Sequence, residues 1–418
     1  MGTLQRQMWV SNDAGSSRRQ RASGVYYWFL PTRLADLDVA LDEDVVFDVS
    51  RAERALAKVD AADLSSTEGI ARLLLRSEAM ASSRIEGLVI GSNRLLRAEL
   101  QARDPEALRY DSKAAAVLGN IHAMEQAARF ASDAQEITTE TLKEVHRALC
   151  AGTDLQEWGG LIRPMQNWVG GSGSNPLNAE YVPPAPEEVE GLLDDLCCYA
   201  NRIDVSPVIQ AALCHAQFET IHPFVDGNGR VGRALIQSVL LRRRAVNGVV
   251  PPISLALATQ RKDYYASLSA YQHALDERLE SEAVNDWVSC FSEAVCEACV
   301  DVQKISDDLL RMRESWCSRL VRVRAGSTLE LMLLKIQAMP YFTIDTMVKA
   351  TRRSKQAVGQ AVKRLLEVQI VCQSNKGKRS RVFEVPDVLD EFNMVERRLA
   401  SPSRDTSVEL PVRPVPNR

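Results

Sequence analysis

One twelve-residue segment, His222-Pro-Phe-Val-Asp-Gly-Asn-Gly-Arg-Val-Gly-Arg233, constrains the fold of this chain more than any other part of its sequence. Its centre, Gly227-Asn228-Gly229, predicts a tight turn of a kind that only glycine tolerates easily. Helical patterns lie on both sides, at Pro207 to Glu219 before the turn and at Gly232 to Ala245 after it. The segment therefore predicts two helices joined by a glycine-rich turn, with a histidine at the end of the first helix.

The same turn predicts a binding site for a polyphosphate. A glycine-rich turn at a helix N-terminus directs N–H groups and the positive end of the helix dipole at an anion. Arg230 and Arg233 lie one helical turn apart and suit charge-assisted bonds to phosphate. Asp226 is a hard oxygen ligand for Mg²⁺, and His222 has a reference pKa of about 6.5, which suits proton abstraction near neutral pH.

Together these residues predict nucleotidyl or phosphoryl transfer, which depends on charge neutralisation and positioning. Taken singly, each feature has an ordinary structural interpretation: a common turn, a structural histidine and a solvated pair of arginines. Their occurrence in this order within twelve residues favours the catalytic interpretation.

The uninterrupted pattern His-Pro-Phe-x-Asp-Gly-Asn-Gly-Arg-x-x-Arg resembles the Fic family, which is also called Fido. The resemblance covers roughly Tyr27 to Leu279 and includes five further stretches: Trp158 to Arg163, Gln166 to Gly170, Tyr181 to Pro184, His215 to Ile221 and Arg261 to Tyr265. It implies a mainly α fold with an all-helical Fic core and a short β-hairpin flap.

The resemblance also implies a reaction, the transfer of AMP from Mg-ATP to a Ser, Thr or Tyr hydroxyl of a target protein or of the enzyme itself. His222 would deprotonate the hydroxyl, Phe224 would hold the loop, and Asp226 would bind Mg²⁺. The residues implied to bind ATP are Gly227, Asn228, Gly229, Arg230, Arg233, Gln217, Gln260 and Tyr264. Core packing is an equal alternative for Tyr264 and Tyr265.

The glycine-rich loop from Asn167 to Tyr181 would be the flap. In the family it docks the target by main-chain strand pairing. The docking residues implied here are Asn167, Trp168, Val169 and Tyr181. The alternative is a plain surface loop.

Ser82-Ser-Arg-Ile-Glu86-Gly87 matches the inhibitory motif of the family. The resemblance implies that Ser82, Glu86 and Gly87 form an intramolecular brake. Glu86 would pair with Arg233 and occupy the γ-phosphate position, so that ATP binds only unproductively. A surface glutamate that caps a local turn is the ordinary alternative.

The remaining sequence divides into ranges of different character. We expect a disordered tail at 1–22, an N-terminal helical region with the inhibitory motif at 23–110, the catalytic core at 111–300, a helical linker at 301–326, a winged helix at 327–395 and a second disordered tail at 396–418. Within the second of these ranges, Val25 to Leu30 predicts an edge strand or a strap.

Helix, helix, helix and hairpin is the outline of a winged helix. Nine basic residues lie between Arg352 and Arg381, and only Glu367 opposes them. Such a surface suits contacts with the phosphates of a DNA duplex. The candidate contacts are Arg353, Lys355, Lys363, Lys378 and Arg379. A protein-docking module is the alternative.

Composition places the chain among soluble cytoplasmic proteins. The formal net charge of −4 argues against a whole-chain nucleic-acid coat. No apolar run is long enough to cross a membrane, and the polar stretch from Met1 to Gly24 leads us to expect no signal peptide. Nine cysteines without framework spacing predict reduced thiols. Family members often self-associate, so the resemblance also implies a homodimer.

Two alternatives to AMP transfer stay open at this point. A Fic site can move another nucleotide moiety, or remove AMP. The chain could instead be a DNA-binding transcriptional regulator whose Fic core senses a nucleotide.

Overall fold

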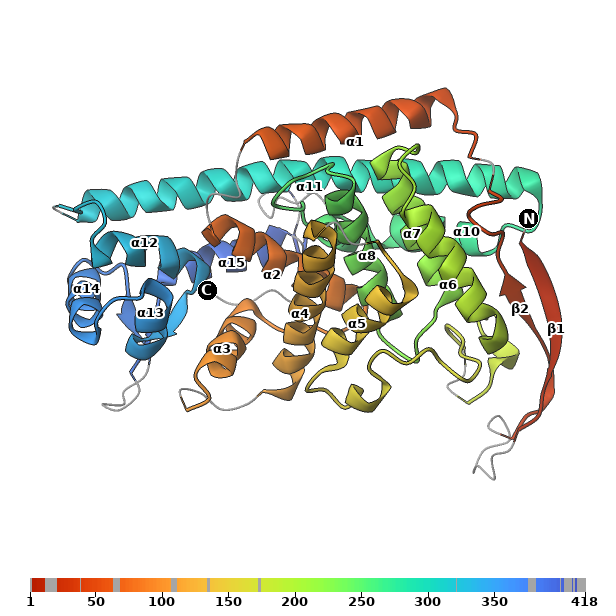
Figure 1. Cartoon of the computed structure of the whole chain (residues 1–418), viewed down its shortest axis with the longest axis horizontal. Coiled ribbons are helices and arrows are strands. Elements are labelled where there is room, and N and C mark those ends of the chain that lie inside the picture. Colours follow the sequence, from red (N-terminus) through yellow and green to blue (C-terminus); the bar gives the residue numbers. More distant parts are fainter. Residues whose placement is uncertain are drawn as a thin grey trace. The chain divides into compact units, whose positions relative to one another are not determined.

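The computed structural model describes residues 2–11, 21–37, 39–62, 68–106, 111–133, 136–171, 174–320, 322–374, 381–398, 400–401, 408 and 410–411. Helices dominate it, and the only sheets among these residues are a two-stranded ribbon and a small three-stranded sheet. The prediction of a mainly α fold is therefore confirmed (Figure 1). None of the helices in these ranges combines the length and the apolar character needed to cross a bilayer.

The chain divides into two compact units, and each unit is made of three separate segments. The first comprises Met1–Arg54, His122–Ala245 and Arg261–Ala294, and the second comprises Ala55–Ile121, Val246–Gln260 and Val295–Arg418. This division differs from the consecutive ranges expected above. Three helices continue from one unit into the other: α1 (Glu43–Ala61), α4 (Ser112–Ser132) and α11 (Glu277–Arg319).

The first unit contains the strands and helices around the predicted catalytic segment. They are β1 (Thr3–Trp9), β2 (Gly24–Leu30), α5 (Thr139–Cys150), the 3-10 turns η2 (Gln156–Trp158) and η3 (Pro176–Asn178), α6 (Pro186–Ala200), α7 (Pro207–Ile221), α8 (Asn228–Arg242) and α10 (Arg261–Gln272).

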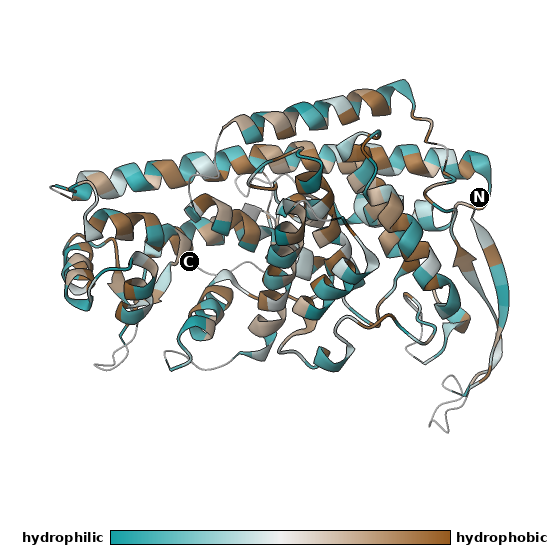
Figure 2. Ribbon diagram, in the orientation of Figure 1, coloured by the Kyte–Doolittle hydropathy of each residue, from teal (hydrophilic) through white to brown (hydrophobic). Residues whose placement is uncertain are grey.

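Helix α7 lies at the centre of this unit, and every residue from Gln210 to Ile221 is buried. It packs against α6 and α8, and α8 also packs against α5. Trp287 of α11 is buried as well, and its indole N–H donates to the carbonyl of Ala212 at 2.8 Å. A helix that is buried on all sides, such as α7, lacks the polar stripe of a surface helix. Along α1, by contrast, hydrophobic and hydrophilic residues alternate (Figure 2).

The N-terminal ribbon corrects one expectation. We expected residues 1–22 to be disordered, but Thr3–Trp9 pair with Gly24–Leu30 as antiparallel strands. The predicted strand at Val25 to Leu30 is confirmed, and its backbone N–H and C=O groups need hydrogen-bond partners, which β1 supplies. Residues 12–20 lie outside the described ranges.

The second unit contains α2 (Glu68–Ile85), α3 (Ser92–Arg103) and α9 (Ile253–Thr259), together with the C-terminal elements. The latter are α12 (Thr328–Ala338), β3 (Tyr341–Thr343), α13 (Ile344–Thr351), α14 (Lys355–Glu367), β4 (Cys372–Gln373), β5 (Val382–Glu384) and α15 (Pro386–Arg398).

Three helices and a hairpin thus follow one another in the C-terminal region, as the sequence predicts. Strand β3, which the sequence analysis missed, joins the hairpin in a sheet of order β3-β5-β4. Phe342 and Phe383 stack in the core of this region, with ring centroids 5.5 Å apart. The hairpin tip at 375–380 lies outside the described residues.

Candidate functional site

The loop between α7 and α8 is held by two residues in the left-handed conformation. His222, which ends α7, has φ 50° and ψ 59°, and Gly227, which precedes α8, has φ 82° and ψ 8°. A Cβ atom at Gly227 would lie 2.7 Å from Cδ2 of Leu149. The predicted tight turn is confirmed, and glycine is required there both by its backbone angle and by this close approach.

Asn228 ties the loop together through its side chain. Its carbonyl oxygen accepts from the backbone N–H of Phe224 at 2.8 Å, and its amide donates to the carbonyl of Phe224 at 2.9 Å. The Phe224 ring is completely buried. The side chain of Asn228 therefore shapes the loop, and its backbone N–H lies in the first turn of α8, where helix N–H groups point outward.

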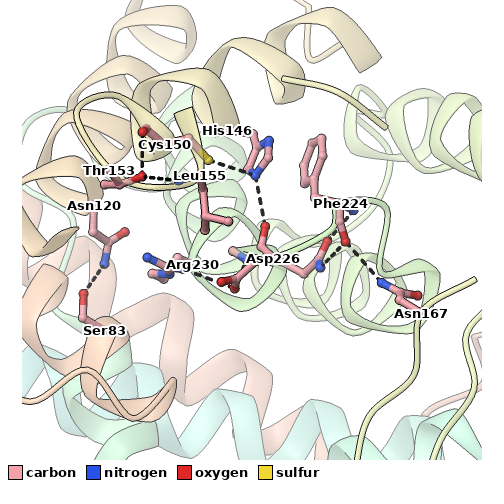
Figure 3. A network of polar contacts seen from close by, with 12 residues as sticks. Ser83, Asn120, His146, Cys150, Thr153, Leu155, Asn167, Phe224, Asp226 and Arg230 are labelled. Atoms are coloured by element: carbon pink, nitrogen blue, oxygen red, sulfur yellow. Dashed lines mark hydrogen bonds and ion pairs between the residues drawn. The ribbon is translucent and has the colours of Figure 1, made fainter. Parts of the chain in front are cut away.

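His146 of α5 contacts the loop, a role that the sequence did not indicate. Its ring stacks on Phe224 with centroids 3.8 Å apart and planes at 10°. The N–H of Gly160 donates to Nδ1 of His146 at 3.0 Å, so Nε2 carries the proton and donates to the carbonyl of Asp226 at 3.0 Å (Figure 3). Burial lowers the pKa of His146 to about 4, which keeps this ring neutral.

Arg163 is a second positioning residue, and its side chain is almost completely buried. Its guanidinium donates to the carbonyls of His222 at 2.9 Å, Met165 at 3.1 Å and Pro184 at 2.5 Å. Its backbone N–H donates to the carbonyl of Pro223 at 2.9 Å. One side chain thus satisfies carbonyl groups at the C-terminus of α7 and in the neighbouring loop, which a helix end requires.

Asn167, expected to dock a target, has contacts with the loop itself. Its amide donates to the carbonyls of Phe224 at 3.2 Å and His222 at 3.4 Å. It therefore helps to hold the loop, in addition to lying at the start of the predicted flap. No local pattern could have identified this role, because the two carbonyls that Asn167 contacts lie 55 and 57 residues away in sequence.

The imidazole of His222 is oriented by α7. Its Nδ1 lies 3.3 Å from the carbonyl oxygen of Glu219. A carbonyl only accepts, so this contact places the proton on Nδ1 and the lone pair on Nε2. His222 is half-buried, which suits a base that must meet a second molecule.

Asp226 and Arg230 lie at the N-terminus of α8. Oδ1 of Asp226 accepts from the N–H of Gly227 at 2.5 Å and from Nη2 of Arg230 at 3.4 Å (Figure 3). The Asp226 side chain is 59% exposed and that of Arg230 only 7%. An exposed carboxylate beside a buried guanidinium and a helix N-terminus suits Mg²⁺, which would neutralise phosphate charge if it were held by Asp226.

Arg233 is buried one turn further along α8. Its Nη1 lies 3.5 Å from the hydroxyl of Tyr264, which in turn lies 3.0 Å from Nε2 of His215. Burial, with a contribution from Arg233, lowers the pKa of His215 to about 3, so this histidine adds no positive charge.

The structure does not gather all the predicted nucleotide contacts in one place. Tyr264 is 1% exposed and packs on His215 and Trp287, as the packing alternative predicts. Gln217 is completely buried, and its amide donates to the carbonyl of Thr32 at 2.9 Å and accepts from the hydroxyl of Tyr271 at 3.2 Å.

Gln260 lies in the second unit and donates to Glu297 at 2.9 Å. Tyr265 is 41% exposed, and Arg261 lies over its ring. These hydrogen bonds of Gln217 and Gln260 therefore join them to Thr32, Tyr271 and Glu297 rather than to the loop that follows His222.

The predicted flap begins and ends in a β-bridge between Val169 and Tyr181. The Tyr181 side chain is buried and donates to the carbonyl of Thr220 at 2.8 Å, which anchors this end to α7. Val169 is 40% exposed. Trp168 packs edge-on against Trp9 of β1, with ring centroids 5.5 Å apart, and residues 172–173 lie outside the described ranges.

The predicted inhibitory residues and DNA contacts belong to the second unit. Ser82 is buried in the last turn of α2, and Glu86 and Gly87, with φ 80°, form the turn that follows. The DNA candidates Arg353, Lys355 and Lys363 are exposed at the start and along the outer side of α14. Lys378 and Arg379 lie outside the described residues.

Comparison with known proteins agrees with this geometry. Residues 46–129 match the family model described as Fic/DOC family N-terminal, and residues 136–240 match the Fic/DOC family model. A protein adenylyltransferase from Caenorhabditis elegans, fic-1, is 33% identical over 136 residues, which are 32% of this chain and 24% of that protein. The Drosophila erecta protein adenylyltransferase Fic is 34% identical over 133 residues, which are 31% of this chain and 24% of that protein.

The chain therefore spans about a quarter of the length of the curated relatives it matches. A crystal structure of a Fic family protein from Desulfovibrio desulfuricans G20 has the same fold, with a TM-score of 0.50 at 16% identity, over 83% of this chain and 97% of that one.

Proposed function

Because this chain contains a Fic/DOC domain preceded by a Fic/DOC N-terminal region, we propose that it is a protein adenylyltransferase that moves AMP from Mg-ATP to a Ser, Thr or Tyr hydroxyl of a target protein. The observation that carries this proposal is the loop from His222 to Arg233. Within it a histidine with its lone pair on Nε2, an exposed carboxylate and two buried arginines surround one helix N-terminus.

The proposed roles follow from these contacts. Nε2 of His222 takes the proton of the target hydroxyl as its oxygen attacks the α-phosphorus. The new bond joins that oxygen to phosphorus, the bond to the bridging oxygen breaks, and pyrophosphate leaves. Arg230, Arg233 and the first N–H groups of α8 stabilise the charge that develops on the phosphates. Mg²⁺, when bound at Asp226, neutralises phosphate charge.

The supporting residues make this arrangement rigid. His146, Arg163 and Asn167 hold the carbonyls of Asp226, His222 and Phe224, all of which belong to the loop. A neutral His146 is important here, because a positive charge on its ring would compete with Arg230 for the carboxylate of Asp226. Positioning of this kind is the main contribution that a protein makes to phosphoryl-type transfer.

We also propose that Glu86 restrains this activity. Glu86 follows α2 in the second unit, whereas Arg233 lies in the first. The support for the brake is the match of Ser82 to Gly87 to the inhibitory motif, together with the positive φ of Gly87, which suits the turn that carries the glutamate.

Transfer from α-³²P-ATP and from γ-³²P-ATP, with Mg²⁺ and with or without cell lysate, tests both proposals. The variants to compare are wild type, Glu86→Gly and Glu86→Gly/His222→Ala, with Glu86→Gly/His122→Ala as the matched control, since His122 is exposed and outside the loop. We expect α-label on protein with Glu86→Gly and with the control, and none once His222 is replaced. Transfer of γ-label alone would show a kinase instead.

A second candidate function rests on the C-terminal elements. We propose that α12 to α14 with the β3-β5-β4 sheet form a winged helix that binds duplex DNA through the exposed Arg353, Lys355 and Lys363 of the α14 region. Fluorescence anisotropy with a labelled duplex at several salt concentrations tests this. Affinity should fall steeply with salt, and Lys363→Ala should reduce the slope by about one unit.

A further inference from the structure

The helix that carries the predicted inhibitory segment is built into the C-terminal region. Helix α2 packs against α9, α12 and α15, all within the second unit. The guanidinium of Arg76 donates to Glu99 at 2.9 and 2.6 Å and to the carbonyl of Ala338, at the end of α12, at 2.6 Å. A Cβ atom at Gly69 of α2 would lie 2.6 Å from Cβ of Gln337, so α2 and α12 approach closely near Gly69.

One of these contacts reaches the inhibitory segment itself. Arg84, which lies between Ser82 and Glu86, forms an ion pair at 3.5 Å with Glu396 of α15. The two side chains are only 12% and 3% exposed. Burial lowers the pKa of Arg84, and the charge of Glu396 opposes that shift. A buried pair of this kind is costly to break on one side, because the remaining charge has no counter-ion.

Neighbouring contacts fix the two ends of the same stretch. The amide of Asn120 donates to the carbonyl of Ala79 at 3.0 Å and to the hydroxyl of Ser83 at 3.1 Å. Beyond the turn, the hydroxyl of Ser92 bonds to the side-chain oxygen of Asn393, which is also on α15. The inhibitory turn is therefore bounded before and after by residues that α15 contacts.

We propose that Glu396 is a positioning residue for the brake: by pairing with Arg84 it fixes the end of α2, and with it the backbone that carries Glu86, so that α15 sets the level of AMP transfer. The inference rests on the proposed transferase activity and its restraint by Glu86. Arg84 lies in the last turn of α2, only two residues before Glu86. A displacement of Arg84 therefore also displaces the backbone that leads to Glu86.

The test measures α-label transfer by the full chain in wild type, Glu86→Gly, Glu396→Gln and the double variant Glu86→Gly/Glu396→Gln. We expect Glu396→Gln to raise transfer about five- to twentyfold, to less than the Glu86→Gly level, which corresponds to about 1–2 kcal/mol of lost restraint. The double variant should equal Glu86→Gly, because the brake is already absent. Asp390→Asn, an exposed charge removed from the same helix, is the matched control and should match wild type.

Two further measurements separate positioning from general loosening. Reversal of the pair, Arg84→Glu/Glu396→Arg, should return transfer towards the wild-type rate, which loss of packing would not do. Hydrogen exchange of residues 84–90 should quicken in Glu396→Gln and not in Asp390→Asn. This readout holds even if Glu86→Gly transfers no label, an outcome that would remove the proposed function alone.

The proposal is overturned if Glu396→Gln exchanges at the wild-type rate across residues 84–90. It is also overturned if Glu86→Gly is active while Glu396→Gln transfers label at the wild-type rate, or if the double variant exceeds Glu86→Gly. Should Glu396→Gln unfold, Glu396→Asp keeps the charge on a shorter stem and is expected to show a smaller increase.

Discussion

Replacement of Arg163 by alanine should both destabilise the first unit and slow AMP transfer. Three of its guanidinium bonds, to the carbonyls of His222, Met165 and Pro184, are 3.1 Å or shorter. Hydrogen bonds to a charged group contribute about 1.5–3 kcal/mol each, so together they contribute about 5 kcal/mol or more. Burial opposes this by lowering the pKa of Arg163 from 12.5 to about 10, which corresponds to about 3 kcal/mol. A net loss of about 2 kcal/mol or more therefore remains.

Urea unfolding at pH 7 measures this loss as a lower midpoint at constant slope. Transfer of α-label in the Glu86→Gly background should fall at least tenfold at a temperature where the variant is still folded, because the carbonyl of His222 loses its 2.9 Å donor and keeps the longer contact with Asn167 at 3.4 Å. Arg202→Ala is the control. Its guanidinium pairs with Asp204 at 2.7 Å, but the two side chains are 42% and 64% exposed, so about 1 kcal/mol or less should be lost.

The reasoning about Arg163 is refuted if Arg163→Ala and Arg202→Ala have the same midpoint and the same transfer rate. Arg163→Lys refines the test. Lysine keeps the charge but cannot present the planar fork that reaches several carbonyls, and we expect it to recover less than half of the lost stability.

Two further predictions concern the loop. Gly227→Ala should lower the free energy of unfolding by about 2–3 kcal/mol and abolish transfer, because the new methyl group adds backbone strain and contacts Leu149. Gly152 shares a positive φ, but a Cβ there would meet nothing within 4 Å, so Gly152→Ala should lower the free energy of unfolding by only about 1 kcal/mol. Equal losses at both glycines would show that the contact with Leu149 contributes nothing. The second prediction concerns pH. The pKa of His146 is lowered to about 4 in the folded state, so below about pH 6.5 the unfolded chain binds a proton that the folded chain does not. The contribution of His146 to the free energy of unfolding is therefore greatest above pH 6.5 and about 2 kcal/mol smaller at pH 5. Urea titrations at pH 7 and pH 5 should show this difference shrinking in His146→Gln, and an unchanged difference would count against a buried neutral His146.

Much of the loop from His222 to Arg233 could be predicted because its information is local. The left-handed backbone at Gly227, the start of α8 and the spacing of Arg230 and Arg233 all follow from neighbouring residues. The family resemblance added the flap and the brake, which no periodicity in the sequence indicates.

The residues that support the loop could not be predicted in the same way. His146 and Arg163 contact the loop from 80 and 59 residues away in sequence, at Asp226 and His222 respectively. A buried histidine or arginine looks like an exposed one when only its neighbours in sequence are known. The resemblance implies an ATP contact for Gln217, whereas its side-chain amide donates to the carbonyl of Thr32 and accepts from the hydroxyl of Tyr271.

Boundaries between compact units also depend on distant contacts. Each unit is formed by three separate segments of the chain, so no single change of composition along the sequence marks the end of a unit. The sequence does not indicate strand β1 because its residues are mostly exposed, and it is held by the backbone of β2 and by the packing of Trp9 against Trp168.

The left-handed backbone of His222 has a consequence for anyone who tries to improve this protein by selection. A residue other than glycine stores about 1 kcal/mol or more of strain in that conformation, and asparagine and glycine adopt it more readily. Libraries screened for heat resistance alone should therefore enrich glycine or asparagine at position 222. The selected variants would be more stable to heat but would lack the proposed base His222, so a screen on this chain must measure AMP transfer and thermal stability together.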